Sequence, residues 1–329
     1  MDTDYVLFIH GVNTRHPIYA DKLFDGIKNY VMNAGKPPRD LKKVALYWGD
    51  VTVEEENKLL EQYQASDAWN SIWYQKLRSG MLLQFTGDVA LYTSRFVGAK
   101  VARKLAEEAE QGLGALHGRN PDTGDRLHLV AHSLGTVILF DLFFSSRWTP
   151  PAPGYQYAMA LRDVVYGIES SRQDGTEPDW SSGICLASIT TMGSPIGLFR
   201  LMDAGPSDRD HLDNTHDITP HLQRMLKRLK NKLGGTLPWL NFIHPGDPLA
   251  TPLNPLILTM VDPAGEYIAV QDILVRTRGL LDGISWLVRR RSLALLDAGG
   301  AHLSYLFSKH ALKDVAARIG QTIIDTAPR

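Results

Sequence analysis

The feature that most constrains the fold of this chain is an apolar run at residues 127–140 that changes from one periodicity to another. Its first part has the composition of a buried strand, and its last part follows helical spacing. The two parts meet at Ala131-His132-Ser133-Leu134-Gly135, where small residues stand two positions before and after a serine. Close passage of a strand and a helix requires such small residues, and Ala131 takes the place of the more usual glycine. The run therefore predicts a sharp strand–turn–helix with Ser133 at its corner.

A serine hydroxyl held at such a corner is suited to attack a carbonyl carbon, which is the chemistry of a nucleophile elbow. The hydroxyl needs a base beside it and an acid that orients the base. In folds that carry this elbow on a parallel sheet, the acid and then the histidine follow the serine, each after a later strand. Both residues are therefore expected downstream of Ser133.

Two downstream residues meet this requirement. Asp247 stands in a Pro-Gly-Asp-Pro turn after the apolar strand predicted at 239–243, and His302 stands after the strand predicted at 268–275. We expect His302 on a glycine-rich loop at the start of a helix. Taken singly, Asp247 could be ordinary turn chemistry and His302 an ordinary cap, but their order and strand context favour catalytic roles. Asp262 and Asp272 are weaker acid candidates, and His310 is a weaker base.

A developing alkoxide would need two backbone N–H groups directed toward it. Leu134 follows the serine and supplies one. Val12, in the loop that follows the early strand predicted at 5–9, supplies the other, since Gly11 lets that loop approach the substrate. His10, Gly11, His132, Gly193 and Ser194 are expected to line the site.

Together these segments resemble the α/β-hydrolase superfamily on its serine lipase/esterase side. The resemblance covers most of the chain and is carried by His10-Gly11-Val12-Asn13, the Ser133 turn, Met192-Gly193-Ser194-Pro195, Asp247-Pro248-Leu249-Ala250 and Ala301-His302. Gly87-Asp88-Val89-x-x-Tyr92 is weakly similar to a helix element of phospholipase-like relatives. The resemblance implies Ser133, Asp247 and His302 as nucleophile, orienting acid and general base, with no metal and no organic cofactor.

The order of predicted elements agrees with this fold. Strands at 5–9, 44–48, 127–131, 184–192, 239–243 and 268–275 alternate with helices at 19–32 and 97–109, and a last helix covers 303–319. This alternation predicts an α/β fold with a mostly parallel central sheet and helices on both faces. We expect one domain over residues 1–329, with a helical segment at 54–116 and a loop-rich segment at 145–182 as excursions or cap elements.

Three further segments bear on substrate and surface. The aromatic stretch 66–83, with Trp69 and Trp73, is interpreted as core packing in preference to an apolar substrate pocket. The stretches 221–232 and 280–296 are basic and amphipathic, and we expect solvated faces there. Peripheral contact of these stretches with membrane lipid is the alternative hypothesis.

Composition narrows the class of protein. The hydrophobic content of 44% in 329 residues is enough for a large core, and the net charge of −1 argues against a nucleic-acid partner. One cysteine, Cys185, excludes an intramolecular disulfide and suits a reducing compartment. No secretory signal or membrane span is visible, so the expected location is cytoplasmic, with leaderless export as an open alternative.

The sequence therefore predicts a serine hydrolase that cleaves carboxylic esters, of lipase, esterase or phospholipase type, through an acyl-enzyme. A catalytically inactive binding or scaffold protein of the same fold is the alternative, and thioesterase or peptidase chemistry would use the same residues. The acyl chain, the biological substrate and the oligomeric state stay open.

Overall fold

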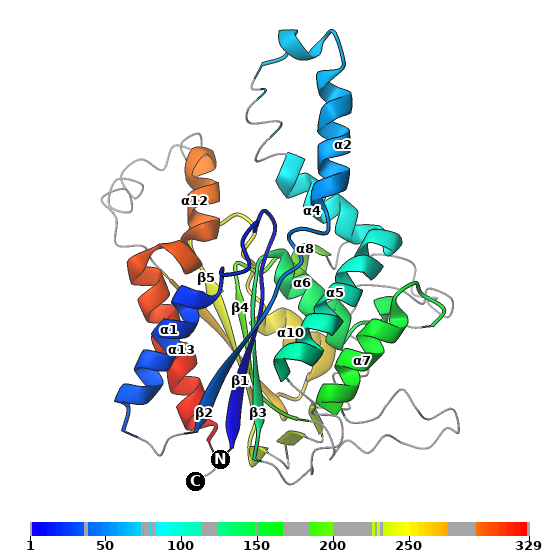
Figure 1. Ribbon diagram of the computed structural model, residues 1–329. Helices are drawn as coiled ribbons and strands as arrows, with labels where there is room; N and C mark the ends of the chain where they lie inside the picture. Colours follow the sequence, from blue (N-terminus) through cyan, green and yellow to red (C-terminus); the bar gives the residue numbers. More distant parts are fainter. Residues whose placement is uncertain are drawn as a thin grey trace.

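A six-stranded parallel sheet forms the centre of the computed structural model (Figure 1). The structure describes residues 2–35, 39–73, 75, 79, 83–113, 124–148, 150–166, 184–199, 226–227, 229–230, 233–275 and 294–327. Its strands, in the spatial order β2-β1-β3-β4-β5-β6, are β2 (Asp40–Leu46), β1 (Thr3–Ile9), β3 (Arg126–His132), β4 (Cys185–Met192), β5 (Leu237–Ile243) and β6 (Ile268–Leu274). Each neighbouring pair is parallel, as the alternation of elements predicts.

The central strands are apolar on both faces because each face is covered. Along β1, Tyr5, Leu7 and Ile9 belong to one buried cluster, whereas Val6 and Phe8 belong to another. This alternation follows from the two-residue period of a strand, and it divides the core into two layers. Both layers are needed to bury a strand such as β3, in which every residue is buried.

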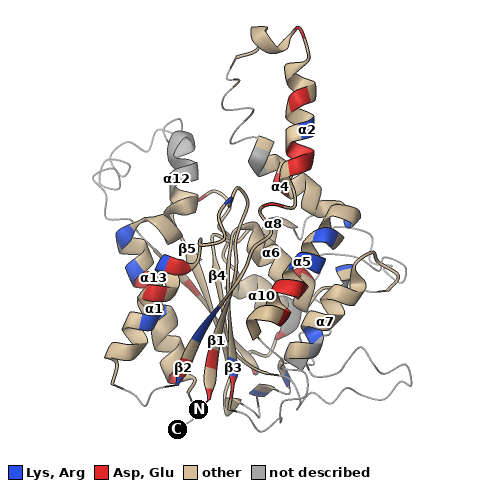
Figure 2. Ribbon diagram, in the orientation of Figure 1, with Lys and Arg blue, Asp and Glu red and all other residues tan. Residues whose placement is uncertain are grey.

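Helices form the outer layers (Figure 1). One face of the sheet carries α1 (Asp21–Asn33) and α13 (Lys309–Asp325), which pack on each other, and α12 (Ala294–Phe307) precedes α13. The other face carries α5 (Arg95–Leu113), α6 (Leu134–Phe143), α7 (Tyr155–Tyr166) and α10 (Asn254–Val261), together with the short α8 (Ile196–Phe199) and the turn η3 (Ser146–Trp148). Figure 2 shows the charged residues mainly on these helices and on β2, which is an edge strand.

A helical arm extends beyond the carboxyl edge of the sheet (Figure 1). It consists of α2 (Val53–Gln64) and η1 (Trp69–Ser71), and α4 (Leu83–Thr93) lies near its base. The first turn of α2 holds three glutamates, and acidic residues outnumber basic ones along this helix (Figure 2).

The strand order sets where a ligand can bind. β2 lies on one side of β1 and β3 on the other, so the chain leaves β1 toward one edge and later returns across it. The connections that follow β1 and β3 therefore run to opposite faces, with α1 on one and α6 on the other. A crevice opens at such a switch point outside the carboxyl ends of the strands, and ligands of open α/β sheets bind there. Here that position is formed by the segments after Ile9 and after His132.

Several element boundaries differ from expectation. β2 begins at Asp40, earlier than the predicted residue 44, because the whole segment pairs with β1 although its edge position leaves lysines exposed. The helix predicted at 303–319 is wrong as a single element: Ser308 adopts an extended conformation and separates α12 from α13. Core packing is wrong for Trp73, which is 78% exposed, while Trp69 stacks on Tyr63.

The predicted basic amphipathic stretches fall mostly outside the described residues. Of the segment 145–182 that we expect to be rich in loops, the described part, 145–148 and 150–166, holds η3 and the helix α7, so the expectation of loop is wrong there, and residues 167–182 lie outside the described residues. Within the described ranges, no helix combines the length and the apolar character needed to cross a membrane.

Candidate active site

The turn at Ser133 has the strained backbone that the sequence predicts. Ser133 has φ of 53° and ψ of −131°, a conformation that costs an L-residue about 1–3 kcal/mol and persists only when its surroundings impose it. Its N–H donates to the carbonyl of Met192 at 2.9 Å. Gly135 lets α6 pass against the end of β1, since a Cβ on Gly135 would lie 2.4 Å from the carbonyl oxygen of His10. The corner therefore presents Ser133 at the switch point of the sheet.

Three buried side chains meet at this corner. The Nε2 atom of His302 lies 2.6 Å from the Oγ atom of Ser133. The Nδ1 atom of His302 lies 2.9 Å from each carboxylate oxygen of Asp247. With the proton on Nδ1, the ring donates to Asp247 and accepts the serine hydroxyl, which is the arrangement of a base ready to take a proton from Ser133.

Asp247 reaches this position from the turn after β5. Its Oδ1 atom accepts the N–H of Leu249 at 3.0 Å, and its Oδ2 atom accepts the hydroxyl of Tyr305 at 2.9 Å. Burial raises the pKa of Asp247, but the hydrogen bond and charge of His302, the amide of Leu249 and the hydroxyl of Tyr305 outweigh it and lower the pKa below its usual value. The carboxylate is therefore ionised at neutral pH.

His302 lies within α12 and not on a loop, so the expected glycine-rich loop at 299–302 is wrong. Residues 294–300 already form helix, in spite of Gly299 and Gly300. The helix continues into the buried residues Ala301, His302 and Tyr305, so it forms in spite of the low helix propensity of glycine.

Tyr305 is the residue of this site that sequence reasoning missed. It is completely buried, and its hydroxyl both donates to Asp247 and accepts the N–H of His244 at 2.7 Å. Burial, followed by the charge of Asp247, raises the pKa of Tyr305 far above its usual value. A helix places residues three apart on one face, so His302 and Tyr305 would have been paired had a helix been expected there.

The weaker candidates take other places. Asp262 accepts the N–H groups of residues 266–268 at the amino end of β6, and Asp272 accepts the side-chain amide of Asn241 and the N–H of Leu253. His310 is exposed on α13. These contacts give both aspartates structural roles away from Ser133.

The fold is decided by the strand order of the parallel sheet and by the places of three residues along the chain. The serine stands on the strained turn after β3, the aspartate follows β5, and the histidine follows β6. The chain has the α/β-hydrolase fold.

Comparison with known proteins gives distant similarities. No family model matches the sequence. The chain is similar to phospholipase DDHD1 of Mus musculus, with 28% identity over 230 residues, which are 58% of this chain and 38% of the relative. For the same phospholipase of Homo sapiens the identity is 27% over 227 residues, covering 58% and 23%. The match thus spans less than half of the length of these relatives.

Among solved structures, the RedJ thioesterase from the prodiginine biosynthetic pathway of Streptomyces coelicolor has a TM-score of 0.34 and 13% identity, covering 97% of this chain and 85% of the other. Dienelactone hydrolase of Anabaena variabilis has a TM-score of 0.28 and 11% identity, covering 93% and 87%.

The two predicted backbone donors of this α/β-hydrolase lie on either side of Ser133. Leu134 begins α6, where the first amides have no partner within the helix. Val12 follows Gly11, and a Cβ on Gly11 would lie 2.4 Å from the Cβ atom of Ser133 and 3.1 Å from its Oγ atom. Among the described residues, neither amide forms a hydrogen bond. Both are therefore available to a ligand.

Two buried histidines next to the site are neutral. Burial is the main cause that lowers the pKa of His10 and of His132 to about 3. The Nε2 atom of His132 donates to the carbonyl of His302 at 2.9 Å. His10 stacks on Trp48, whose backbone N–H donates to His10 Nε2 at 3.0 Å. Each ring therefore holds a neighbouring segment of backbone in place.

The two residues expected from the end of β4 lie at different depths. Gly193 backs directly onto the site, because a Cβ there would lie 2.8 Å from Oδ2 of Asp247 and 3.2 Å from Cε1 of His302. Ser194 lies behind the turn, with its hydroxyl 2.9 Å from that of Thr136. Gly193 thus lies against Asp247 and His302, and Ser194 supports the start of α6.

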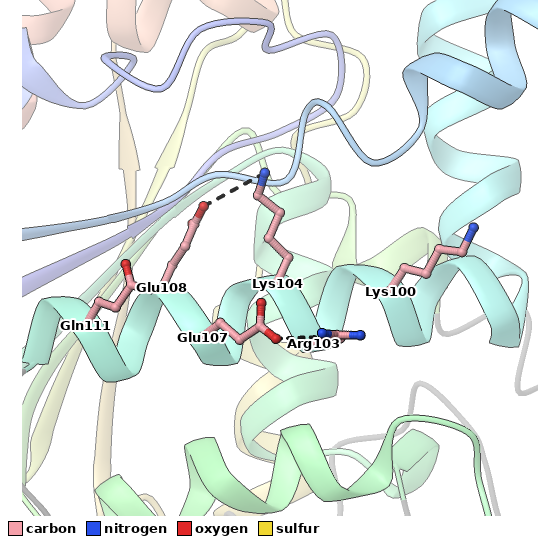
Figure 3. Close-up of a pocket in the computed structure, with 6 residues that line it drawn as sticks. All are labelled: Lys100, Arg103, Lys104, Glu107, Glu108 and Gln111. Atoms are coloured by element: carbon pink, nitrogen blue, oxygen red, sulfur yellow. Dashed lines mark hydrogen bonds and ion pairs between the residues drawn. The ribbon is translucent and has the colours of Figure 1, made fainter.

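No group of metal-binding side chains marks this site within the described residues. In the parts of the chain that the structure describes, no three His, Cys, Asp or Glu side chains are grouped to hold a metal ion. A surface depression of about 430 Å³ lies elsewhere, on the solvent face of α5 (Figure 3). Its side chains all come from this one helix, and ion pairs such as Arg103–Glu107 at 2.8 Å join them. None of Ser133, Asp247 and His302 lines this depression.

Proposed function

We propose that the protein is a serine hydrolase that cleaves carboxylic esters through a Ser133–His302–Asp247 triad. The observation that carries the proposal is the continuous hydrogen-bonded path from the Ser133 hydroxyl through both nitrogens of His302 to Asp247, at 2.6 and 2.9 Å. A serine hydroxyl is a poor nucleophile at neutral pH, and this path is what activates it.

In the proposed reaction, Oγ of Ser133 forms a bond with the ester carbonyl carbon while Nε2 of His302 takes its proton. The carbonyl oxygen becomes an alkoxide, which the N–H groups of Val12 and Leu134 stabilise. When the tetrahedral intermediate collapses, the ester C–O bond breaks and His302 gives the proton to the leaving alcohol. A water molecule then attacks the acyl-enzyme with His302 again as base, which releases the acid and restores Ser133. Asp247 holds the Nδ1–H tautomer and stabilises the imidazolium in both steps.

The substrate class that we propose is an ester of lipid type. It is supported by the similarity to a phospholipase over 58% of the chain. Fold alone supports no particular substrate.

The test is labelling of the purified chain by a fluorophosphonate, followed by hydrolysis of nitrophenyl esters of increasing acyl length and of phospholipid in mixed micelles. Ser133→Ala should abolish labelling and lower kcat by about 10⁴- to 10⁶-fold with an unchanged fold. Ser188→Ala is the matched control, because Ser188 is also buried but bonds to His128 at 2.8 Å, away from Ser133. Retained esterase activity in the Ser133 variant would eliminate the mechanism.

A further inference from the structure

The loop after β1, residues 10–15, carries the Val12 amide. Asn13 has φ of 56°, in the left-handed region, which asparagine adopts more readily than other residues with a side chain. The direction of the neighbouring Val12 amide depends on the groups that hold the two peptides beside it.

Two buried side chains fix the peptide groups on both sides of Val12. With Nε2 of His10 accepting from Trp48, Nδ1 of His10 donates to the carbonyl of Gly11 at 2.7 Å. That carbonyl and the N–H of Val12 belong to one planar trans peptide, so they point in opposite directions and fixing one fixes the other. On the far side, the N–H of Asn13 donates to Oδ2 of Asp88 at 2.7 Å. The Val12 amide lies between these two fixed points.

Asp88 comes from α4, a different part of the chain, and it is itself held firmly. It is 1% exposed, and its Oδ1 atom accepts the hydroxyl of Thr52 at 2.6 Å. Nη1 of Arg15 lies 3.6 Å from the same oxygen and donates to the carbonyl of Gly49 at 2.7 Å. A buried carboxylate is costly unless it is paired and hydrogen-bonded, and these contacts meet that requirement. The charged acceptor also makes its bond to Asn13 stronger than a neutral one would be.

We propose that Asp88 is the positioning residue of the oxyanion hole. It fixes the Val12–Asn13 peptide so that the Val12 N–H stays directed at the oxygen of a substrate bonded to Ser133. Asp88 neither touches the substrate nor moves a proton. The inference rests on the proposed ester hydrolysis, because the Val12 amide is needed as a donor only where attack by Ser133 forms an alkoxide.

The test compares Asp88→Ala and Asp88→Asn with the wild type. We measure kcat and KM with a nitrophenyl ester and divide kcat by the fraction of chains that a fluorophosphonate labels at the serine. We also measure the inhibition constant of a trifluoromethyl ketone, which forms a tetrahedral adduct with the serine. Because a misplacement of about 1 Å can cost about 100-fold, Asp88→Ala should lower kcat about 10- to 100-fold with KM nearly unchanged. The inhibition constant should rise in the same proportion. Asp88→Asn keeps a neutral acceptor and should lose about threefold to tenfold.

Asp262→Ala and Asp262→Asn are the matched controls. Asp262 is a buried carboxylate that also accepts backbone N–H groups, but at the opposite end of the sheet. Its variants should lose stability while kcat per labelled serine stays within about twofold. If both alanine variants fail to fold, the asparagine pair decides. The proposal is overturned if the Asp88 and Asp262 variants lose kcat equally. It is also overturned if the Asp88 variants keep the wild-type kcat and the wild-type inhibition constant for the ketone.

The two proposals fail in different ways. If the wild-type chain takes no fluorophosphonate at Ser133, the proposed function fails and the Asp88 inference falls with it. If labelling is complete in every variant but the Asp88 variants match the wild type, only the inference about Asp88 fails.

Discussion

Replacing Tyr305 by phenylalanine removes one hydroxyl and leaves the ring, so Asp247 loses one donor and the N–H of His244 loses this acceptor. The lost bond to Asp247, 2.9 Å long, has a charged acceptor, and such bonds contribute about 1.5–3 kcal/mol. Asp247 keeps its bonds to His302 and to the N–H of Leu249. We therefore expect the free energy of unfolding at pH 7 to fall by about 1.5–3 kcal/mol. If the bond is stronger in the transition state, where the imidazolium forms, by about half of this amount, kcat falls about 3- to 10-fold.

The loss should depend on pH with a definite sign. The folded protein lowers the pKa of Asp247, so the ionised carboxylate contributes stability that is present above the unfolded pKa of 3.8 and is lost as pH falls through the folded value. Without the Tyr305 hydroxyl the folded pKa rises toward the unfolded one. The difference in stability between wild type and variant is therefore largest above about pH 5 and shrinks in more acidic solution.

The assay is urea unfolding at several pH values, with kcat per titrated active site measured on the same samples. Tyr92→Phe is the control, because its hydroxyl also donates to a buried carboxylate, Asp141, at 2.6 Å and away from Ser133. It should cost similar stability but leave kcat unchanged. A Tyr305→Phe loss that does not vary with pH, or a kcat no lower than that of Tyr92→Phe, would refute the role given to the hydroxyl.

Two further substitutions test the frame around the site. Burial, with a second carboxylate nearby, raises the pKa of Glu56 from 4.5 to about 7, so wild-type stability should fall as pH rises between these values. Glu56→Gln mimics the protonated form and should be more stable than wild type by about 2 kcal/mol at pH 8 in urea unfolding. The control Glu61→Gln, at an exposed position, should change stability little. If stability still falls with rising pH in Glu56→Gln as it does in wild type, the prediction is contradicted. Gly135→Ala places a Cβ against the carbonyl of His10 and should lower stability by at least about 3 kcal/mol and kcat about 100-fold, while Gly235→Ala, with no atom within 4 Å, should leave both intact. Calorimetry and the ester assay check this pair, and a normal Gly135→Ala protein would refute the close passage of α6 and β1.

Local patterns were sufficient to predict the frame of the fold. The parallel sheet, the helices α1 and α5 and the turn at Ser133 follow from periodicity and small residues, because a strand or helix leaves its period in its own residues. The segment 299–302 was predicted wrongly for the opposite reason: its glycines indicate a loop when taken alone, although they belong to a helix whose next residues are buried.

The contacts that complete the candidate site lie beyond such patterns. Ser133 and His302 stand 169 positions apart, and Asn13 and Asp88 stand 75 apart. Chain order made His302 a candidate, but nothing local specifies that Tyr305 bonds Asp247 or that Asp88 holds the loop after β1. The sequence by itself determined which elements form and which residues stand at the ends of strands. Only the tertiary structure decided which of these side chains meet, because hydrogen bonds of about 3 Å depend on how distant elements pack and not on the residues next to them.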